Sequence, residues 1–273
     1  MNDHALHLVE DRFASASAGR DVDYRVLLPA DRARGERLPL VLHLHGAMSS
    51  AESLDRARPL YEDLYRQGAF PRAVVACVST PTLDGFYLDR PGGAAWETLV
   101  TDEFPAHLAS VHGPLGATAL LGASMGGYGV LKAAFRAPER FAAVAALSPA
   151  VFPGETPGEV PAANLPSVLG ELHRAMGHGS DDAAAYAGNS VQGRARRHAA
   201  AIRGAGLPVL VDCGAADEFL LHEGAAHLHG VLAELGIAHT FRLVDGAGHL
   251  GPEAEVRTGE AIRFVGAALG ARP

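Results

Sequence analysis

A serine between glycines stands where a buried strand would meet a helix. The stretch Leu120–Ala133, LLGASMGGYGVLKA, starts apolar, passes through Gly122, Ser124 and Gly126, and continues with helical spacing. Glycine weakens regular elements, so its repetition at this junction needs a reason. A G-x-S-x-G pattern between a strand and a helix is typical of a sharp turn that lifts the serine hydroxyl above the sheet edge. The spacing therefore predicts that Ser124 is a nucleophile.

A serine hydroxyl needs a base to remove its proton, and histidine is the usual base. With this type of turn, the base follows the last strand, on a loop. The sequence has 14 histidines. His222, His227, His229 and His239 fall in a helical stretch or at the start of a strand. His249, in VDGAGHLGPE, has the required loop position, and we predict it as the base.

The histidine needs an acid to orient it, and VDCGAADEFLL offers Asp212, Asp217 and Glu218. Asp212 lies within an apolar run that reads as a strand, where its side chain would cap or brace a loop. Asp217 stands on the loop beyond that strand, where a carboxylate can reach the distal nitrogen of the histidine. We predict Asp217 as the acid, with Asp245 on the histidine's own loop as the alternative.

An acyl-transfer site also needs two backbone amides for the developing oxyanion. The amide of Met125, directly after the nucleophile, is one candidate, and the HGA segment after an early strand supplies Ala47 as the other. His43 and His45 could instead form an H-x-H metal pair, but no further ligands are spaced nearby. We expect His45 to brace the oxyanion loop, and we expect no metal and no cofactor.

Short apolar runs alternate with longer amphipathic stretches from about residue 38 onward. The predicted strands are 38–46, 73–80, 117–124, 141–149, 207–214 and 239–246, and the predicted helices lie near 51–67, 96–111, 126–137, 219–235 and 253–269. This alternation predicts an α/β fold with a mostly parallel central sheet and helices on both faces. The first 30 residues alternate polar and apolar residues, which predicts an antiparallel hairpin at the sheet edge.

One segment breaks the alternation. Between Val151 and Gly204 the composition shifts to Pro, Gly and Ala, without an evident strand. We interpret this segment, about 151–204, as an insertion of loops and short helices that either caps a site or is a plain excursion. No linker marks a boundary, so we expect residues 1–273 to form a single domain.

Composition narrows the class of partner. The net charge of −8 gives no sign of a nucleic-acid-binding surface, and we interpret the arginines of Arg194–Arg203 as a solvated helix face. No apolar run approaches the length of a membrane span. The N-terminus lacks the apolar core of a signal peptide, and Cys77 and Cys213 read as buried hydrophobes. We expect a cytoplasmic protein that acts on a small molecule and binds neither nucleic acid nor membrane, and a homo-oligomer remains open.

These segments together resemble the α/β-hydrolases of the esterase D group, which includes S-formylglutathione hydrolases, tributyrin-type carboxylesterases and mycolyltransferases. The resemblance covers most of residues 38–270. It rests on VLHLHG, the block GFYLDRPGGAAWETLVTDEFPAHL, the serine turn with its following helix and strand, VDCGAADEFL, and GAGH. The block around Trp96, with its W-E-T sequence, is the most specific part, because general α/β-hydrolases lack it.

The resemblance implies an α/β-hydrolase fold with Ser124, Asp217 and His249 as the triad, and it suggests that Trp96 and Glu97 lie close to the site. For Trp96, a core position at the start of a helix is an equal alternative. Two departures matter. S-formylglutathione hydrolases carry a cysteine in the oxyanion loop, whereas HGAMSS has none. Mycolyltransferases are exported, whereas we expect no signal peptide in this sequence.

The function predicted from these residues is a serine carboxylic-ester hydrolase that forms an acyl-enzyme on small acyl or aryl esters. Within the enzyme class, a thioesterase or an acyltransferase to a sugar or alcohol remains open. The alternative outside the enzyme class is a non-catalytic binding module on the same scaffold. Five apolar or aromatic residues are candidates to line the substrate pocket: Phe86, Tyr87, Trp96, Tyr128 and Leu220.

Overall fold

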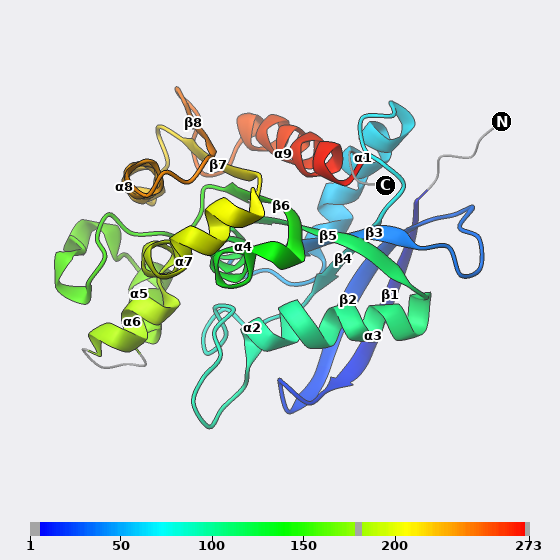
Figure 1. Cartoon of the computed structure of the whole chain (residues 1–273), viewed down its shortest axis with the longest axis horizontal. Coiled ribbons are helices and arrows are strands. Elements are labelled where there is room, and N and C mark those ends of the chain that lie inside the picture. The colour runs from blue at the N-terminus through cyan, green and yellow to red at the C-terminus, as the bar shows by residue number, and fades with distance from the viewer. Residues whose placement is uncertain (1–5, 178–181, 271–273) are drawn as a thin grey trace.

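The computed structural model describes residues 6–177 and 182–270. Within these residues eight strands form one sheet in the order β1-β2-β4-β3-β5-β6-β7-β8 (Figure 1). The strands are β1 (Leu6–Ser15), β2 (Arg20–Pro29), β3 (Leu38–Leu44), β4 (Val74–Val78), β5 (Leu115–Ala123), β6 (Phe141–Leu147), β7 (Val209–Gly214) and β8 (Thr240–Val244). β1 and β2 form an antiparallel hairpin, β2 also pairs antiparallel with β4, and all other neighbours are parallel. The predicted sheet and its antiparallel N-terminal edge are confirmed.

Helices follow most of the parallel strands. They are α1 (Ser53–Arg66), α2 (Trp96–Thr98), α3 (Phe104–His112), α4 (Met125–Arg136), α5 (Val168–Met176), α6 (Ala183–Asn189), α7 (Val191–Ala205), α8 (Leu221–Glu234) and α9 (Pro252–Gly270). Short 3-10 turns lie at Pro138–Arg140, Pro157–Glu159 and Ala162–Asn164. Among the described residues, no helix is long and apolar enough to cross a membrane.

The helix expected near 96–111 is interrupted. A π-helical segment, Leu99–Glu103, separates α2 from α3. Pro105 follows it, and proline has no N–H to donate to the carbonyl four residues earlier. That carbonyl belongs to Thr101, and it accepts a hydrogen bond of 2.7 Å from Arg140 Nη2 instead. A single proline therefore explains the change of helical pitch.

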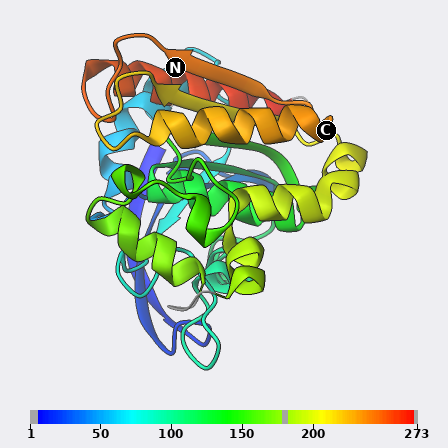
Figure 2. The same cartoon turned by 90° about the vertical axis from the view of Figure 1, so that its left-hand side faces the viewer.

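Two hydrophobic layers enclose the sheet. Successive strand residues point to opposite faces, so Leu40 and Leu42 pack with the α4 side while Val41 packs with the α1 side. The first layer contains α3, α4, α7 and α8, and the second contains α1 and α9 (Figures 1 and 2). The carboxyl ends of the parallel strands meet at one sheet edge, which is where an α/β fold places its site.

The segment 151–204 holds no strand, but it is more than an insertion of short helices. α5 and α6 are short, whereas α7 has 15 residues and packs against α4 and α8 as part of the first layer. The interpretation of Arg194–Arg203 as a solvated face is therefore only partly right. Arg197 is exposed, but Arg194 is buried and forms an ion pair with Glu97, because α7 faces the protein interior there.

Candidate active site

Ser124 occupies the turn between β5 and α4. Its φ of 56° and ψ of −119° are strained for a residue with a side chain. Both of its backbone groups are held by the end of β6 and the segment after it: the Ser124 N–H donates to Leu147 O at 2.9 Å, and its carbonyl accepts from Ala150 N at 3.0 Å. The surrounding structure thus fixes a turn that the serine would not adopt alone.

The glycines around Ser124 are explained by close approach of backbone. A Cβ on Gly122 would overlap the carbonyl of Gly126, and a Cβ on Gly126 would overlap the carbonyl of Leu44 in β3. The helix can therefore start directly beside the strands only if both positions lack a side chain. This is the structural reason for the G-x-S-x-G spacing.

The acid and the histidine come together across two loops. His249 Nδ1 lies 2.8 Å from Asp217 Oδ2, and the other oxygen of Asp217 accepts from Phe219 N at 3.0 Å. Burial alone would raise the pKa of Asp217, but the hydrogen bond and charge of His249, with backbone amides, bring that pKa below its ordinary value. The ionised Asp217 accepts a hydrogen bond from the N–H at Nδ1 of His249. Nε2 of the ring then carries no proton and is free to accept one.

Among the other candidate carboxylates, Glu218 supports His249 by binding the backbone N–H of the histidine. Glu218 Oε2 accepts a hydrogen bond of 2.7 Å from His249 N, and the side chain packs so closely on Gly248 that a Cβ there would be crowded. Asp212 is buried inside β7 and pairs with Arg257. Asp245, the alternative acid, is exposed, and Asp217 occupies the position next to Nδ1.

Met125 and Ala47, the two predicted oxyanion donors, lie close to Ser124. Met125 is the first residue of α4, so its N–H has no partner within the helix and the positive helix end adds to it. Ala47 lines the same cavity as Ser124, and a Cβ on Gly46 would lie 3.6 Å from Ser124 Cβ. The oxyanion loop is therefore within contact distance of the nucleophile.

The oxyanion loop is held from beneath by His45 and Tyr87. Thr80 N donates to His45 Nε2 at 3.0 Å, so the proton of the ring lies on Nδ1, which donates to Gly46 O at 2.8 Å. Tyr87 Oη donates to His45 O at 2.9 Å. Burial lowers the pKa of His45, which keeps the ring neutral in this role. His45 braces the loop, as its position in the sequence predicted.

The alternative of a metal pair finds no support in these contacts. His43 is buried, with its Nδ1 3.1 Å from Tyr61 Oη, and burial lowers its pKa to about 4. In the described part of the chain, no group of three or more histidine, cysteine or acidic side chains is arranged to hold a metal ion.

A cavity of about 740 Å³ opens beside Ser124 and His249. Its floor includes His43, Leu121 and Leu147 at the sheet. Helices α1 and α9 contribute one part of the wall, including Leu60 and Thr258. Helix α5 contributes Val168 and Leu169, and the loop before α8 with the first residue of that helix contributes Phe219 and Leu221. A volume of this size is typical of a site for a small organic molecule.

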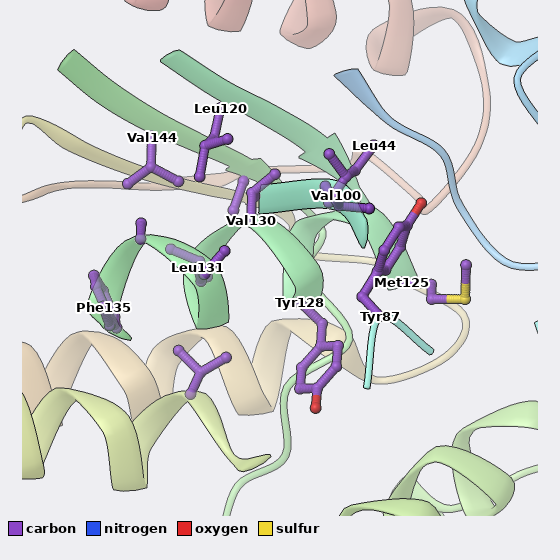
Figure 3. Close-up of a cluster of buried hydrophobic side chains, with 14 of the residues drawn as sticks. Leu44, Tyr87, Val100, Leu120, Met125, Tyr128, Val130, Leu131, Phe135 and Val144 are labelled. Carbon is purple, nitrogen blue, oxygen red and sulfur yellow. The ribbon is translucent and has the colours of Figure 1, made fainter. Parts of the chain in front are cut away.

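The five residues predicted to line the pocket do not line this cavity. Phe86, Tyr87, Trp96 and Tyr128 are buried in the core, and Figure 3 shows Tyr87 and Tyr128 in the cluster around α4. Leu220 is partly buried between Phe219 and Leu221, which do line it. The prediction failed because large aromatic side chains bury the most apolar area and here fill the layer beneath α4.

Glu97 lies in a buried ion network. Its carboxylate accepts from Lys132 Nζ at 2.8 Å and from Arg194 Nη1 and Nη2 at 2.5 and 2.9 Å. Trp96 beside it packs under the guanidinium of Arg20, 5.0 Å from the ring centroid. Neither residue lines the cavity. The W-E-T segment therefore ties α2 to α4 and α7 and does not reach the site.

The comparison with known families decides the class of protein. Residues 15–236 match the esterase family described as "Putative esterase". The chain belongs to this esterase family. It is an esterase, and the family predicted from the sequence motifs is confirmed. No curated protein matches the esterase at the sequence level.

Solved structures show the same fold along nearly the whole esterase. A ferulic acid esterase has 23% identity and a TM-score of 0.78, with 97% of this chain and 99% of that one covered. An S-formylglutathione hydrolase from Agrobacterium tumefaciens has 21% identity and a TM-score of 0.75, over 99% and 100%. Serine hydrolase FphF of Staphylococcus aureus, a fluorophosphonate-binding protein, has 17% identity and a TM-score of 0.70, over 95% and 98%. At these identities the likeness establishes the α/β-hydrolase fold.

Proposed function

We propose that this esterase hydrolyses small acyl or aryl esters through an acyl-enzyme on Ser124, with His249 as base and Asp217 as its orienting acid. The observation that carries the proposal is the 2.8 Å contact between His249 Nδ1 and the ionised Asp217, with His249 lining the same cavity as the strained Ser124. Nε2 of His249 takes the hydroxyl proton as Ser124 Oγ attacks the ester carbonyl. Two amides, of Met125 and Ala47, stabilise the oxyanion.

The same groups complete the formation of the acyl-enzyme and then its hydrolysis. His249 gives its proton to the departing alcohol, which leaves the acyl group on Ser124. A water molecule then loses a proton to Nε2 and attacks the acyl carbon, and Nε2 returns that proton to Ser124 Oγ as the free acid leaves. No metal ion or cofactor is required in any of these steps.

The cavity supports a mostly apolar substrate group near the strand ends, and the exposed Arg56 and Glu255 also line it. Burial keeps His43 on the floor neutral, since it lowers the pKa of that residue to about 4. Leu121 and Leu147 complete an apolar floor. At the mouth, Met48 is 85% and Leu250 75% exposed, which places apolar surface where an ester would enter.

Assays with p-nitrophenyl esters test the proposed function. We expect turnover of the acetate and butyrate, with activity falling toward the palmitate, because a cavity of about 740 Å³ is of the size typical for small-molecule sites. A fluorophosphonate should label Ser124 and abolish turnover. Rates that rise steadily toward palmitate would contradict the substrate class, and labelling elsewhere would contradict the mechanism.

We also propose a cytoplasmic location and a small-molecule ester as the partner. The free thiols of Cys77 and Cys213, both buried, support a reducing compartment. Fractionation of the producing cells tests the location, since recovery of the protein outside the cytoplasm would contradict it.

A further inference from the structure

We propose that Arg257 is a positioning residue of the esterase, whose guanidinium holds the three loops of the triad in register. This inference rests on the proposed function of Ser124, Asp217 and His249. Arg257 lies on α9, is 4% exposed, and borders the cavity with its side chain directed into the protein.

The first contact of Arg257 reaches the segment after β6, which supports the nucleophile through hydrogen bonds. Its Nη2 donates to Ser148 Oγ at 2.9 Å. Ser148 lies between Leu147 and Ala150, whose backbone groups hold the N–H and the carbonyl of Ser124. Ser148 also has a positive φ of 37°, so its backbone is strained and depends on such contacts.

The second contact reaches the strand that carries the acid. Arg257 Nε donates to Asp212 Oδ1 at 2.5 Å, inside β7. The carbonyl of Asp212 accepts from Ser148 N at 2.6 Å, which joins the ends of β6 and β7. β7 ends shortly before Asp217, so the strand end held by Arg257 is the base of the acid loop.

The third contact reaches the histidine loop. Arg257 Nη1 donates to Gly248 O at 3.2 Å, one residue before His249. Glu218 holds the next amide along, His249 N, at 2.7 Å. The peptide bond before the histidine is thus fixed from both sides, by Arg257 at its carbonyl and by Glu218 at its N–H.

Arginine suits this role because its planar fork presents several N–H groups in fixed directions. Nε, Nη1 and Nη2 of one side chain reach three separate segments, namely β7, the histidine loop and the segment after β6. A lysine keeps the charge opposite Asp212 but cannot reach Ser148 and Gly248 together. Asp212 keeps a second cation, Arg242, with Nε 3.1 Å from Oδ2, so removal of Arg257 does not leave the carboxylate without a counterion.

The test compares Arg257→Met with Arg194→Met. Arg194 is a matched control, because it is also a buried arginine paired with a buried carboxylate, Glu97, yet it contacts none of the triad loops. For each variant we would measure kcat and KM for p-nitrophenyl acetate and the rate of fluorophosphonate labelling of Ser124. Melting temperature and near-ultraviolet circular dichroism would confirm that the variant is folded at the assay temperature.

We expect Arg257→Met to lower kcat and the labelling rate by about 100-fold with KM little changed, since small misplacement of reacting groups costs about that much. Arg257→Lys should recover part of the loss, and Ser148→Ala should lose less than Arg257→Met. Arg194→Met should lower the melting temperature but keep kcat per folded molecule. Should Arg257→Met fail to fold, Arg257→Lys and Ser148→Ala carry the test.

Two results would overturn the inference. One is a folded Arg257 variant that is labelled and turns over ester at the wild-type rate. The other is an Arg194→Met protein that loses kcat as much as Arg257→Met does, because the effect would then be general loosening. Failure of wild-type Ser124 to react with the fluorophosphonate would instead count against the proposed function itself.

Discussion

At the scale of single residues, the site depends on backbone geometry as much as on side-chain chemistry. Ser124 is held in a strained conformation by carbonyl and amide groups at the end of β6 and in the segment after it. His249 is held by Asp217 at its ring and by Glu218 at its amide. The sequence motif names the reacting groups, but the groups that fix them come from elsewhere in the chain.

The triad residues should behave as one unit in kinetics. We expect Ser124→Ala and His249→Ala each to lower kcat for p-nitrophenyl acetate by on the order of 10⁴ or more, with the double variant little worse, because loss of one member removes the function of the others. Asp217→Asn should cost less than Ser124→Ala. Measured kcat values for the single and double variants check this.

Asp245→Asn is the matched control for the acid, because Asp245 lies exposed on the same loop as the histidine. It should leave kcat unchanged. An inactive Asp245→Asn beside a fully active Asp217→Asn would transfer the acid role to Asp245.

At the scale of elements, the cavity is made by helices that flank the strand ends. α1 and α9 cover the same sheet face (Figure 1). Side chains from both helices line the space next to the nucleophile. The same two helices follow the oxyanion loop and the histidine loop directly. A substrate group in this space is therefore bounded by elements that also place the reacting groups.

Leu60→Trp should narrow this space between α1 and α9. Leu60 is partly buried and lines the cavity, so an indole there would occupy volume that a larger acyl or aryl group needs. We expect kcat/KM to fall about tenfold or more for the butyrate and for aryl esters, with a small effect on the acetate. Val111→Trp, at an exposed position on α3, is the control. Equal losses for acetate and butyrate would show that the substrate group lies elsewhere.

Some features of the site could be predicted from the sequence, and others could not, for physical reasons. Ser124, Asp217 and His249 were placed by loop position and chain order, which glycines and apolar periodicity reveal. Arg257 carried no such signal, because an arginine on an amphipathic helix looks like a solvated residue until the fold buries it. Tyr128 gave the opposite error, since an aromatic residue near the nucleophile suits a pocket and a core equally well.

At the scale of the whole molecule, one buried ion network joins the first helical layer. Glu97 of α2 binds Lys132 of α4 and Arg194 of α7, and all three side chains are buried. Burial would raise the pKa of Glu97, but the two cations and their hydrogen bonds lower it to about 2. Burial lowers the pKa of Lys132 to about 8 despite Glu97, so both groups remain charged near neutral pH.

Glu97→Gln should destabilise the fold and change its response to acid. The variant leaves Lys132 and Arg194 without their buried counterion, a loss that typically costs about 3–5 kcal/mol. In the wild type, the depressed pKa of Glu97 stabilises the fold above the unfolded value of 4.5, and this contribution is lost as the pH falls toward about 2. A shift of that size corresponds to about 3 kcal/mol.

Urea unfolding at about pH 5 and about pH 3 would measure this difference. Because glutamine does not titrate, the free energy of unfolding of Glu97→Gln should fall less on acidification than that of the wild type. Glu139→Gln, at an exposed position after α4, should follow the wild-type pH dependence. If Glu97→Gln and the wild type lost the same free energy between the two pH values, the ionised Glu97 would not be what stabilises this layer in acid.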